Sequence, residues 1–200
     1  MPLDPERRTL MLKAYLTDYL DTVQYLVSQV PVEQVESIVL RLVDLYERGG
    51  VLALVGNGGS ASTASHIAND FQKCLYDLFG KPFRCLALTD SLPIITAWAN
   101  DTDYTNVFAP QVRTWLGKDD VLIAISGSGN SPNVLKAVES AKEQGAYTIG
   151  LTGYRGGKLA AIAHESIIVP CENMQQIEDV HLILVHLVFS GMRERIAGRV

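Results

Sequence analysis

The sequence predicts a doubly wound α/β protein, with a five-stranded parallel sheet between two layers of helices and a pair of added helices at the amino terminus. Two observations lead to this fold class. After residue 50, short apolar runs alternate with helical stretches, and the runs cover 51–56, 83–88, 120–126, 148–153 and 166–170. Each run is apolar on both faces, as a parallel sheet covered by helices on both sides requires.

The first fifty residues show the spacing of amphipathic helices. Asp4-Pro5 is typical of a helix start, with an N-cap residue followed by proline in the first turn. Apolar residues then recur at steps of three and four, which predicts a helix over 5–29 that ends before the next proline. A second helix follows and ends at Gly49-Gly50. Its apolar face carries Val35, Ile38, Leu42 and Leu45.

Helical periodicity fills the gaps between the predicted strands, and a long amphipathic helix begins near Met174. The stretches between strands lie near 60–78, 90–99, 104–116, 132–144 and 157–163. A chain of 200 residues, 48% of them hydrophobic, is long enough for one sizeable core. It contains no repeat, low-complexity tract or linker. We therefore expect one domain over 1–200, in which a helical extension (1–49) packs on an α/β core (50–200).

Charge and apolar patterning exclude several classes of protein. A net charge of −5 argues against a nucleic-acid surface, which needs clustered lysine and arginine. The amino terminus lacks the pattern of a secretory signal, and no apolar run approaches the roughly 18 residues of a membrane span. Cys74, Cys85 and Cys171 lack CxxC spacing, which favours reduced thiols. We expect a cytoplasmic protein without nucleic-acid or membrane partners.

Open parallel sheets bind ligands beyond the carboxyl ends of their strands, so the loops after the strands form the candidate site. The first loop is GNGGS at 56–60, whose glycines permit close approach of the backbone. Ser60 is expected to cap the next helix. The stretch 56–61 also matches the dinucleotide fingerprint, which expects an acidic residue about 20 positions further on. The nearest candidate, Asp90, lies well beyond that distance, so we expect no nucleotide cofactor.

The second loop, SGSGNSP at 126–132, follows the third strand. Ser131 is expected to cap the next helix and Pro132 to occupy its first turn, where a missing N–H costs nothing. Free backbone N–H groups and three hydroxyls at a helix start form an anion site without a lysine. A plain strand-to-helix turn is the alternative, although it needs only one serine and one glycine. Two such loops suit a phosphorylated sugar, one binding the phosphate and the other the hydroxyls.

Two helices carry residue pairs suited to proton transfer or metal binding. His66 and Asp70 stand four residues apart and share one face of the helix after the first loop. Glu178 and His186 stand eight residues apart on the last helix, which separates them by about 80° around its axis. Ordinary polar positions on packed helices are the alternative for each. His181 is expected to be structural or to support its neighbours.

Four motifs together resemble the sugar isomerase (SIS) domain family: GNGGSASTASH at 56–66, AND at 99–101, ISGSGNSPNVLKA at 125–137 and LTGYRGGKLA at 151–160. Their order and spacing are similar to those of its phosphoheptose isomerase branch. The resemblance implies an aldose–ketose isomerase that converts sedoheptulose 7-phosphate into glycero-manno-heptose 7-phosphate through an enediol. It also implies active sites shared between subunits and a zinc ion, which many members bind. The broad apolar stripe of the first helix, which includes Tyr15, Tyr19 and Leu26, predicts a homotetramer, or at least a dimer.

Matched residue by residue, the resemblance implies a role for each candidate. The family's zinc ligands fall on His66, Asp70, Glu178 and His186, and its proton-transfer pair falls on Asp70 and His186. Its substrate contacts fall on Asn57, Gly58, Gly59, Ser60, Asn100, Asp101, Ser126, Ser128, Ser131 and Glu178.

The chain departs from the family pattern at several of these positions. Asp70 replaces glutamate and Glu178 replaces glutamine, while Cys74 and Gln175 replace an arginine and an aspartate. A shift of roughly 1 Å can cost about 100-fold in rate, so the shorter Asp70 bears directly on the heptose reaction. Two imidazoles and two carboxylates still suit zinc. The alternatives are a metal-free site with Asp70 or Glu178 as base and His186 as acid, an isomerase for another phosphosugar, and a non-catalytic sugar-phosphate-binding adaptor or regulator.

Overall fold

The computed structural model describes residues 5–200, with side chains from residue 8 onward; Asp4, the expected N-cap of the first helix, lies outside this range. Five parallel strands form one sheet in the order β2-β1-β3-β4-β5. The strands are β1 (Val51–Val55), β2 (Arg84–Ala87), β3 (Val121–Ser126), β4 (Tyr147–Gly153) and β5 (Glu165–Val169). The predicted five-stranded parallel sheet is confirmed. The strand order reverses between β1 and β3, so their carboxyl ends form the expected ligand edge.

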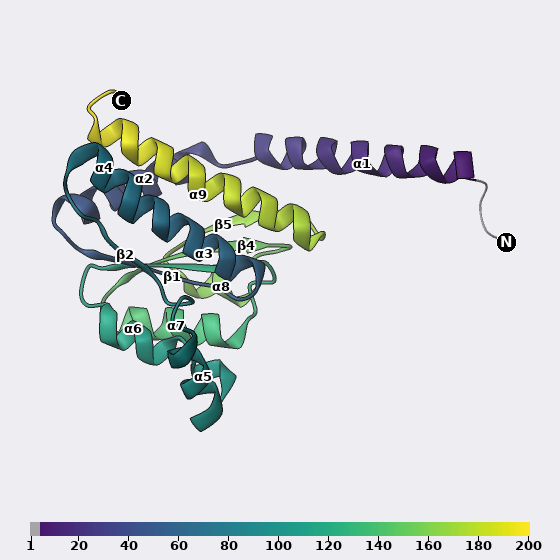
Figure 1. Cartoon of the computed structure of the whole chain (residues 1–200). Helices are drawn as coiled ribbons and strands as arrows, with labels where there is room; N and C mark the ends of the chain where they lie inside the picture. Colours follow the sequence, from purple (N-terminus) through teal and green to yellow (C-terminus); the bar gives the residue numbers. More distant parts are fainter. Residues whose placement is uncertain (1–4) are drawn as a thin grey trace.

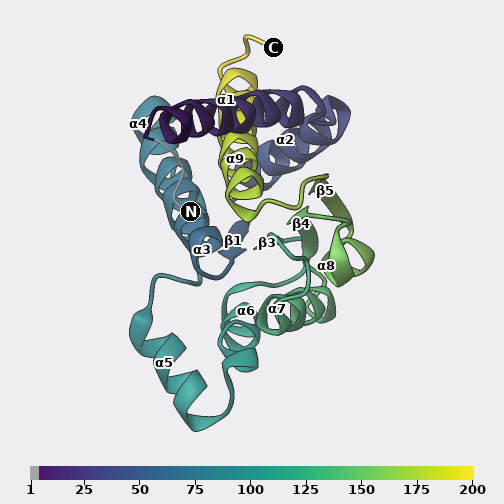
Figure 2. The ribbon, with the colours of Figure 1, turned by 90° about the vertical axis from the view of Figure 1, so that its right-hand side faces the viewer.

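Helices cover both faces of the sheet (Figure 1, Figure 2). One layer holds α2 (Val32–Glu47), α3 (Gly59–Asn69), α4 (Leu75–Phe79) and α9 (Met174–Ile196). The other layer holds α6 (Ala109–Trp115), α7 (Pro132–Glu143) and α8 (Gly157–Ile162). α5 (Leu92–Asp101) extends away from this second layer, and none of its residues is buried (Figure 1). The arrangement is the doubly wound one that the sequence predicts.

The core lies on both sides of the sheet, because successive strand residues point to opposite faces. In β1, Leu52 and Leu54 pack under α2, α3 and α9, whereas Val51, Ala53 and Val55 pack against α6 and α7. All five side chains are buried. α2 contributes seven buried residues to the first of these clusters, so this part of the predicted helical extension packs on the α/β core.

α1 (Pro5–Ser28) projects from the body of the molecule, and its bounds agree with the predicted helix to within one residue (Figure 1). Its second half is attached to α9. The Tyr19 hydroxyl donates to Asp179 Oδ2 at 2.6 Å, and Gln176 Nε2 donates to the Tyr19 carbonyl oxygen at 3.3 Å. The hydrogen bond to Asp179 raises the pKa of Tyr19 to about 12. Apolar side chains along the first two thirds of α1 are exposed; they are Leu10, Met11, Leu12, Tyr15, Leu16 and Leu20.

The helix predicted over 60–78 consists of three consecutive pieces: α3, a π-helical segment (Asp70–Cys74) and α4. α3 begins at Gly59, and its N-cap is Gly58, which has a φ of 55°. The expectation that Ser60 caps this helix is therefore wrong. The left-handed backbone that glycine permits at position 58 starts the helix earlier, so Ser60 lies buried in the first turn.

The helix predicted over 104–116 is also divided, into a 3₁₀ turn (Tyr104–Asn106) and α6. The Asp103 side chain begins the turn by accepting from the Thr105 N–H at 2.8 Å. Such local hydrogen bonds favour turns over continuous helix. Over residues 5–200, no helix combines the length and the hydropathy needed to span a bilayer.

Candidate active site

The loops after β1 and β3 lie side by side at the carboxyl edge of the sheet, because β1 and β3 are neighbouring strands. A reciprocal pair of amide hydrogen bonds joins them. Asn57 Nδ2 donates to Asn133 Oδ1 at 2.9 Å, and Asn133 Nδ2 donates to Asn57 Oδ1 at 2.8 Å. The Tyr104 hydroxyl donates to the same Asn57 oxygen at 3.1 Å. Asn133 is buried, so this pair fixes the two ligand loops relative to each other.

The second loop is held from its other side by the last residue of β4 and the segment that follows it. The Gly153 N–H donates to the Gly127 carbonyl oxygen at 2.8 Å, and the Leu159 N–H donates to the Gly129 carbonyl oxygen at 2.9 Å. Gly129 has a φ of 65°, and a Cβ built on it would lie 2.7 Å from the carbonyl carbon of Gly156. The approach of the two backbones therefore requires glycine at position 129.

Hydroxyl and amide groups line the second loop. Ser131 occupies the N-cap position of α7, but the side-chain cap expected of it is absent, because Ser131 Oγ lies 3.1 Å from Ser126 Oγ instead. Ser128 Oγ accepts from the Asn130 N–H at 3.2 Å. The first N–H groups of a helix have no partner within the helix. Three hydroxyls beside such groups form an arrangement that can bind a phosphate.

The packing of α3 against α9 brings His66, Asp70 and His186 into one group. His66 Nε2 lies 2.8 Å from His186 Nε2, and Asp70 Oδ2 lies 3.6 Å and 3.8 Å from these two nitrogens. The side chains of His66 and His186 are 49% and 44% exposed, and that of Asp70 is 19% exposed. The group is therefore open to solvent on the side of its imidazoles.

The geometry of this group fits a divalent metal ion. Ligand atoms at about 2.05 Å from a tetrahedral zinc ion lie roughly 3.4 Å from one another. The three separations in the group, from 2.8 to 3.8 Å, bracket that value. Zinc enzymes also use two imidazole nitrogens with one carboxylate oxygen and leave the fourth position to water or substrate. The donor atoms and their spacing thus suit a catalytic metal centre better than a closed structural one.

Glu178, the fourth expected metal ligand, lies apart from this group and at the start of α3. A Cβ built on Gly59 would lie 2.6 Å from the Glu178 carboxyl carbon, so that the carboxylate covers the first turn of α3. Eight residues of α-helix rise by about 12 Å, which separates Glu178 from His186 along α9. The angle of about 80° around the axis places the two residues on neighbouring faces of α9, but this rise keeps their side chains apart. The Glu178 carboxylate faces the positive end of the α3 dipole.

Other predicted residues lie in different surroundings. Asn100 and Asp101 are exposed at the end of α5, where Asn100 Nδ2 donates to Asp101 Oδ1 at 2.9 Å. His181 is buried, and its Nε2 donates to the Thr152 carbonyl oxygen at 3.0 Å. Burial lowers the pKa of His181. A buried histidine that donates to a strand carbonyl has a structural role, which is one of the two roles expected for it.

Sequence reasoning missed Asn133 and Tyr104, which position the first loop through Asn57. A signal was present for one of them. Asn133 stands in the first turn of α7, and asparagine is unfavourable within a helix unless its side chain finds a partner there. No comparable signal marks Tyr104, because it reaches Asn57 from a separate segment of the chain.

Comparison with known proteins finds a matching family model and similar relatives. A family model described as "SIS domain" matches residues 18–153. A phosphoheptose isomerase from Aneurinibacillus thermoaerophilus is 37% identical over 163 residues, which are 81% of each chain. One from Helicobacter pylori (strain P12) is 40% identical over 167 residues, 84% of this chain and 86% of the relative.

Solved structures agree with these sequence matches. The phosphoheptose isomerase structure from Neisseria gonorrhoeae superimposes with a TM-score of 0.83 at 30% identity, covering 93% of this chain and 98% of its own. A phosphoheptose isomerase from Francisella tularensis gives a TM-score of 0.85 at 27% identity, covering 92% and 97%. Both matches extend over nearly the whole of the fold described above.

Proposed function

The chain belongs to the SIS domain family, and from this membership we propose that it is an aldose–ketose isomerase that converts sedoheptulose 7-phosphate into glycero-manno-heptose 7-phosphate. The observation that carries the proposal is that one helix, α3, connects a loop suited to bind the substrate with residues suited to proton transfer. α3 begins at the first ligand loop and carries His66 and, at its end, Asp70, which form an open group with His186. Relatives named phosphoheptose isomerase, at 37% and 40% identity, support the choice of substrate.

The isomerisation moves one proton between neighbouring carbon atoms and one between their oxygens. A base removes a proton from C1 of the ketose to give an enediol, and a proton is returned to C2. The hydroxyl proton of O1 is lost as O2 gains one. C1 is oxidised as C2 is reduced, so the reaction needs no external electron acceptor. The protein must therefore supply a base, an acid and groups that stabilise the developing negative oxygen.

In this proposal Asp70 is the base and His186 is the acid. The Nε2 atoms of His66 and His186 are 2.8 Å apart, so one ring donates to the other and a proton can pass between them. The loop at 126–131 binds the phosphate through its amides, Ser126, Ser128 and Ser131. The first loop binds sugar hydroxyls through Asn57, Gly58, Gly59 and Ser60, and the remaining substrate contacts are Asn100, Asp101 and Glu178.

As the alternative to this acid–base pair, we propose that His66, Asp70 and His186 hold a zinc ion. Asp70 would then be a ligand, and it would have to leave the metal before it could act as the base. When bound, zinc would supply a Lewis acid for the enediolate oxygen. Glu178 is the fourth ligand implied by the resemblance, but its carboxylate lies against Gly59. In this conformation Glu178 is better suited to accept hydrogen bonds from sugar hydroxyls beside the first loop.

The test is exchange of substrate protons for solvent deuterium, measured with a panel of ketose and aldose phosphates. We expect exchange to be fastest with sedoheptulose 7-phosphate and to fall at least about 100-fold in Asp70→Asn, the lower range for loss of a general base. Asp77→Asn is the matched control, because Asp77 pairs with Lys73 on the outer side of this helical segment. Faster exchange with another phosphosugar would identify a different substrate, and no exchange with any sugar would favour the adaptor alternative.

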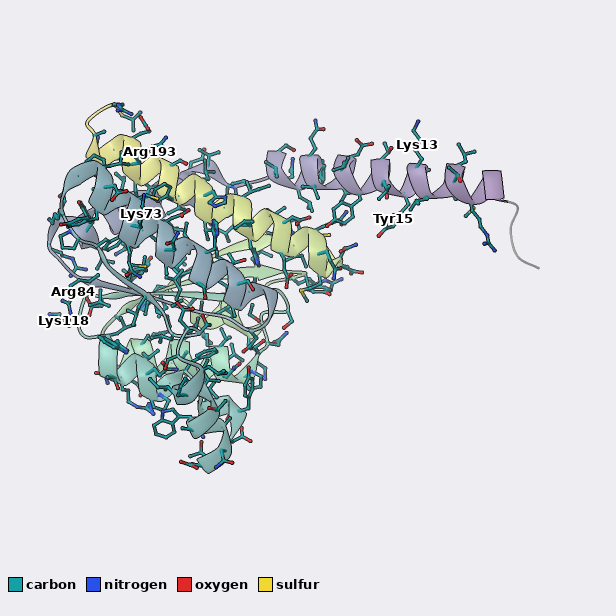
Figure 3. The ribbon with its side chains drawn as sticks, viewed as in Figure 1. Lys13, Tyr15, Lys73, Arg84, Lys118 and Arg193 are labelled. Carbon is teal, nitrogen blue, oxygen red and sulfur yellow. The ribbon has the colours of Figure 1, made fainter. Side chains whose placement is uncertain are left out.

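We propose that the protein is a homotetramer, or at least a dimer, and that it works in the cytoplasm. The exposed apolar side chains of α1 support the assembly, because a projecting helix of this kind buries them only against another chain. Figure 3 shows Lys13 and Tyr15 on opposite sides of this projecting helix. Light scattering at micromolar protein tests the assembly, and a monomeric mass would contradict it. Leu16→Glu on the same helix is expected to lower the mass of the particle.

A further inference from the structure

A cavity lies at the edge of the sheet opposite the candidate active site, where the strands begin. Its volume is about 340 Å³, and it lies between the end of α2 and the first residues of β4, lined by Arg41, Asp44, Arg48, Asp119, Tyr147 and His164 among others. Cavities that bind small molecules commonly have volumes from about 300 Å³ upward. β4 runs from this cavity to the second ligand loop, and six residue steps of strand span about 20 Å. The cavity is therefore separate from the candidate active site.

Arg41 is held in a fixed position within this cavity. Its guanidinium carbon lies 3.5 Å from the centre of the Tyr147 ring. On its other side the Tyr147 ring stacks on His164, with 4.8 Å between ring centres and 14° between ring planes. A guanidinium stacked on an aromatic ring keeps its N–H groups free in the plane for a planar or tetrahedral oxyanion. The stack thus prepares Arg41 to bind a ligand.

Among the described side chains, which begin at residue 8, Arg41 has no hydrogen-bonding or ionic partner, and its Nε is buried. The other arginine of the cavity is already paired. Arg48 Nε donates to Asp44 Oδ2 at 3.1 Å, and Arg48 also donates to the Asp119 carbonyl oxygen. A buried donor without an acceptor is unfavourable, so the Nε of half-buried Arg41 is the donor in this cavity that a bound anion would satisfy.

His164 adds a second donor to the cavity. Its Nδ1 accepts from the Thr148 N–H at 3.0 Å and lies 2.8 Å from Thr148 Oγ1. The proton of the neutral ring is therefore on Nε2. Outside the cavity, Arg84 and Lys118 lie at the same edge of the sheet (Figure 3). Their positive charge favours the approach of an anion.

We propose that this cavity is a binding site for a small oxyanion, a phosphorylated or carboxylated sugar, whose phosphate or carboxylate binds Arg41. A sugar rather than a bare anion fits the remaining lining, because Asp44 and Asp119 place carboxylates at the cavity and carboxylates accept from hydroxyl groups. The volume leaves room for such a group beside the anion. The site does not depend on the proposed isomerase activity, since it shares no residue with the loops or with the group around Asp70.

Glu165 offers an internal alternative as the partner of Arg41. Its Oε2 is buried and unpaired, and Glu165 is paired in register with Ile149, which places it on the same face of the sheet as Tyr147. If Arg41 and Glu165 form an ion pair in solution, Arg41 has no need of a ligand. The experiment is designed to separate these two cases.

The test is a titration of the ¹⁵N-labelled full chain with inorganic phosphate, glucose 6-phosphate and gluconate, followed by amide shifts in NMR spectra. We expect amides 145–148 to shift, and to saturate independently of amides 127–130 in the second ligand loop. Arg41→Gln is expected to weaken the binding that amides 145–148 report by about tenfold or more. Arg84→Gln removes the same charge from the same edge but leaves the cavity intact, so binding is expected to change less than about twofold.

Four outcomes would overturn the proposal. Amides 145–148 do not shift at millimolar ligand, Arg41→Gln leaves their titration unchanged, or Arg84→Gln weakens it as much as Arg41→Gln does. The fourth is binding in Glu165→Gln but not in the unmodified chain, which would make Glu165 the partner of Arg41. Should Arg41→Gln fail to fold, Arg41→Lys takes its place. It keeps the charge without the paired N–H groups, and weaker binding of all three ligands is again the expected result.

Discussion

Replacing Gly129 with alanine tests whether the second ligand loop depends on its contact with the segment after β4. Gly129 has a φ of 65°, and an added Cβ would lie 2.7 Å from the Gly156 carbonyl carbon and 3.0 Å from the Gly157 Cα. These atoms belong to backbone, which no side-chain rotation can move. We expect Gly129→Ala to separate the two segments and so to displace the amides and hydroxyls that bind phosphate.

Two costs contribute to the expected loss of stability. A left-handed backbone costs a non-glycine residue about 1–2 kcal/mol. Inserting a methyl group into a packed site costs a further 1–3 kcal/mol or so. The Gly156 carbonyl oxygen would lie closer still, and even the contact with the Gly156 carbonyl carbon must lengthen by about 0.7 Å to reach an ordinary packing distance. The second cost therefore belongs in the upper part of its range. We expect Gly129→Ala to lower the free energy of unfolding by about 3–5 kcal/mol.

Gly80→Ala is the matched control. Gly80 has a φ of 67°, and an added Cβ there would have no neighbour within 4 Å, so only the backbone cost of about 1–2 kcal/mol applies. Urea unfolding gives both free energies, and the KM for the phosphosugar measures the loop itself. We expect a raised KM in Gly129→Ala and an unchanged KM in Gly80→Ala. Equal stabilities of the two variants, or an unchanged KM in both, would refute the reasoning.

Two further predictions concern Asp70 and His181. Asp70→Asn is expected to weaken zinc binding at least about tenfold, because losing even a residue that only supports a ligand costs that much. Competition with a chelator measures the affinity. Equal affinity in Asp70→Asn and Asp77→Asn would contradict the prediction. Burial lowers the pKa of His181 below the ordinary value for histidine, about 6.5. The unfolded chain therefore takes up a proton that the folded chain does not, and stability falls as the pH drops below about 6.5, by up to about 1.4 kcal/mol per pH unit. His181→Gln should lessen this slope in urea unfolding between pH 5 and 7, and an unchanged slope would argue against it.

The strands and most helices were predictable from the sequence because their signals are local. Each strand is a run of apolar residues, and the observed bounds of β1 and β3 differ from the predicted ones by one residue at an end. The pairing of His66 with Asp70 is equally local, since four residues of helix bring two side chains to one face. The ligand edge of the sheet followed from parallel strand order, which depends on the number and spacing of these local elements.

Other features depend on contacts between residues far apart in the chain, which leave little trace in local sequence. His186 reaches His66 across 120 residues because α3 and α9 pack together. Glu178 lies at Gly59 because the rise of α9 carries it away from His186. The start of α3 at Gly59, instead of after Ser60, follows the backbone of the loop before it.

The sequence by itself therefore determined the fold class, the family resemblance, the two ligand loops and the residue types available for proton transfer. Only the tertiary structure decided that three of the four expected metal ligands meet, that Asn57 and Asn133 join the loops, and that Arg41 faces a cavity without a partner. The physical reason is that local and tertiary interactions act over different distances along the chain. Hydrophobic periodicity and turn chemistry act over a few residues, whereas the distance between two side chains on different elements is set by how those elements pack.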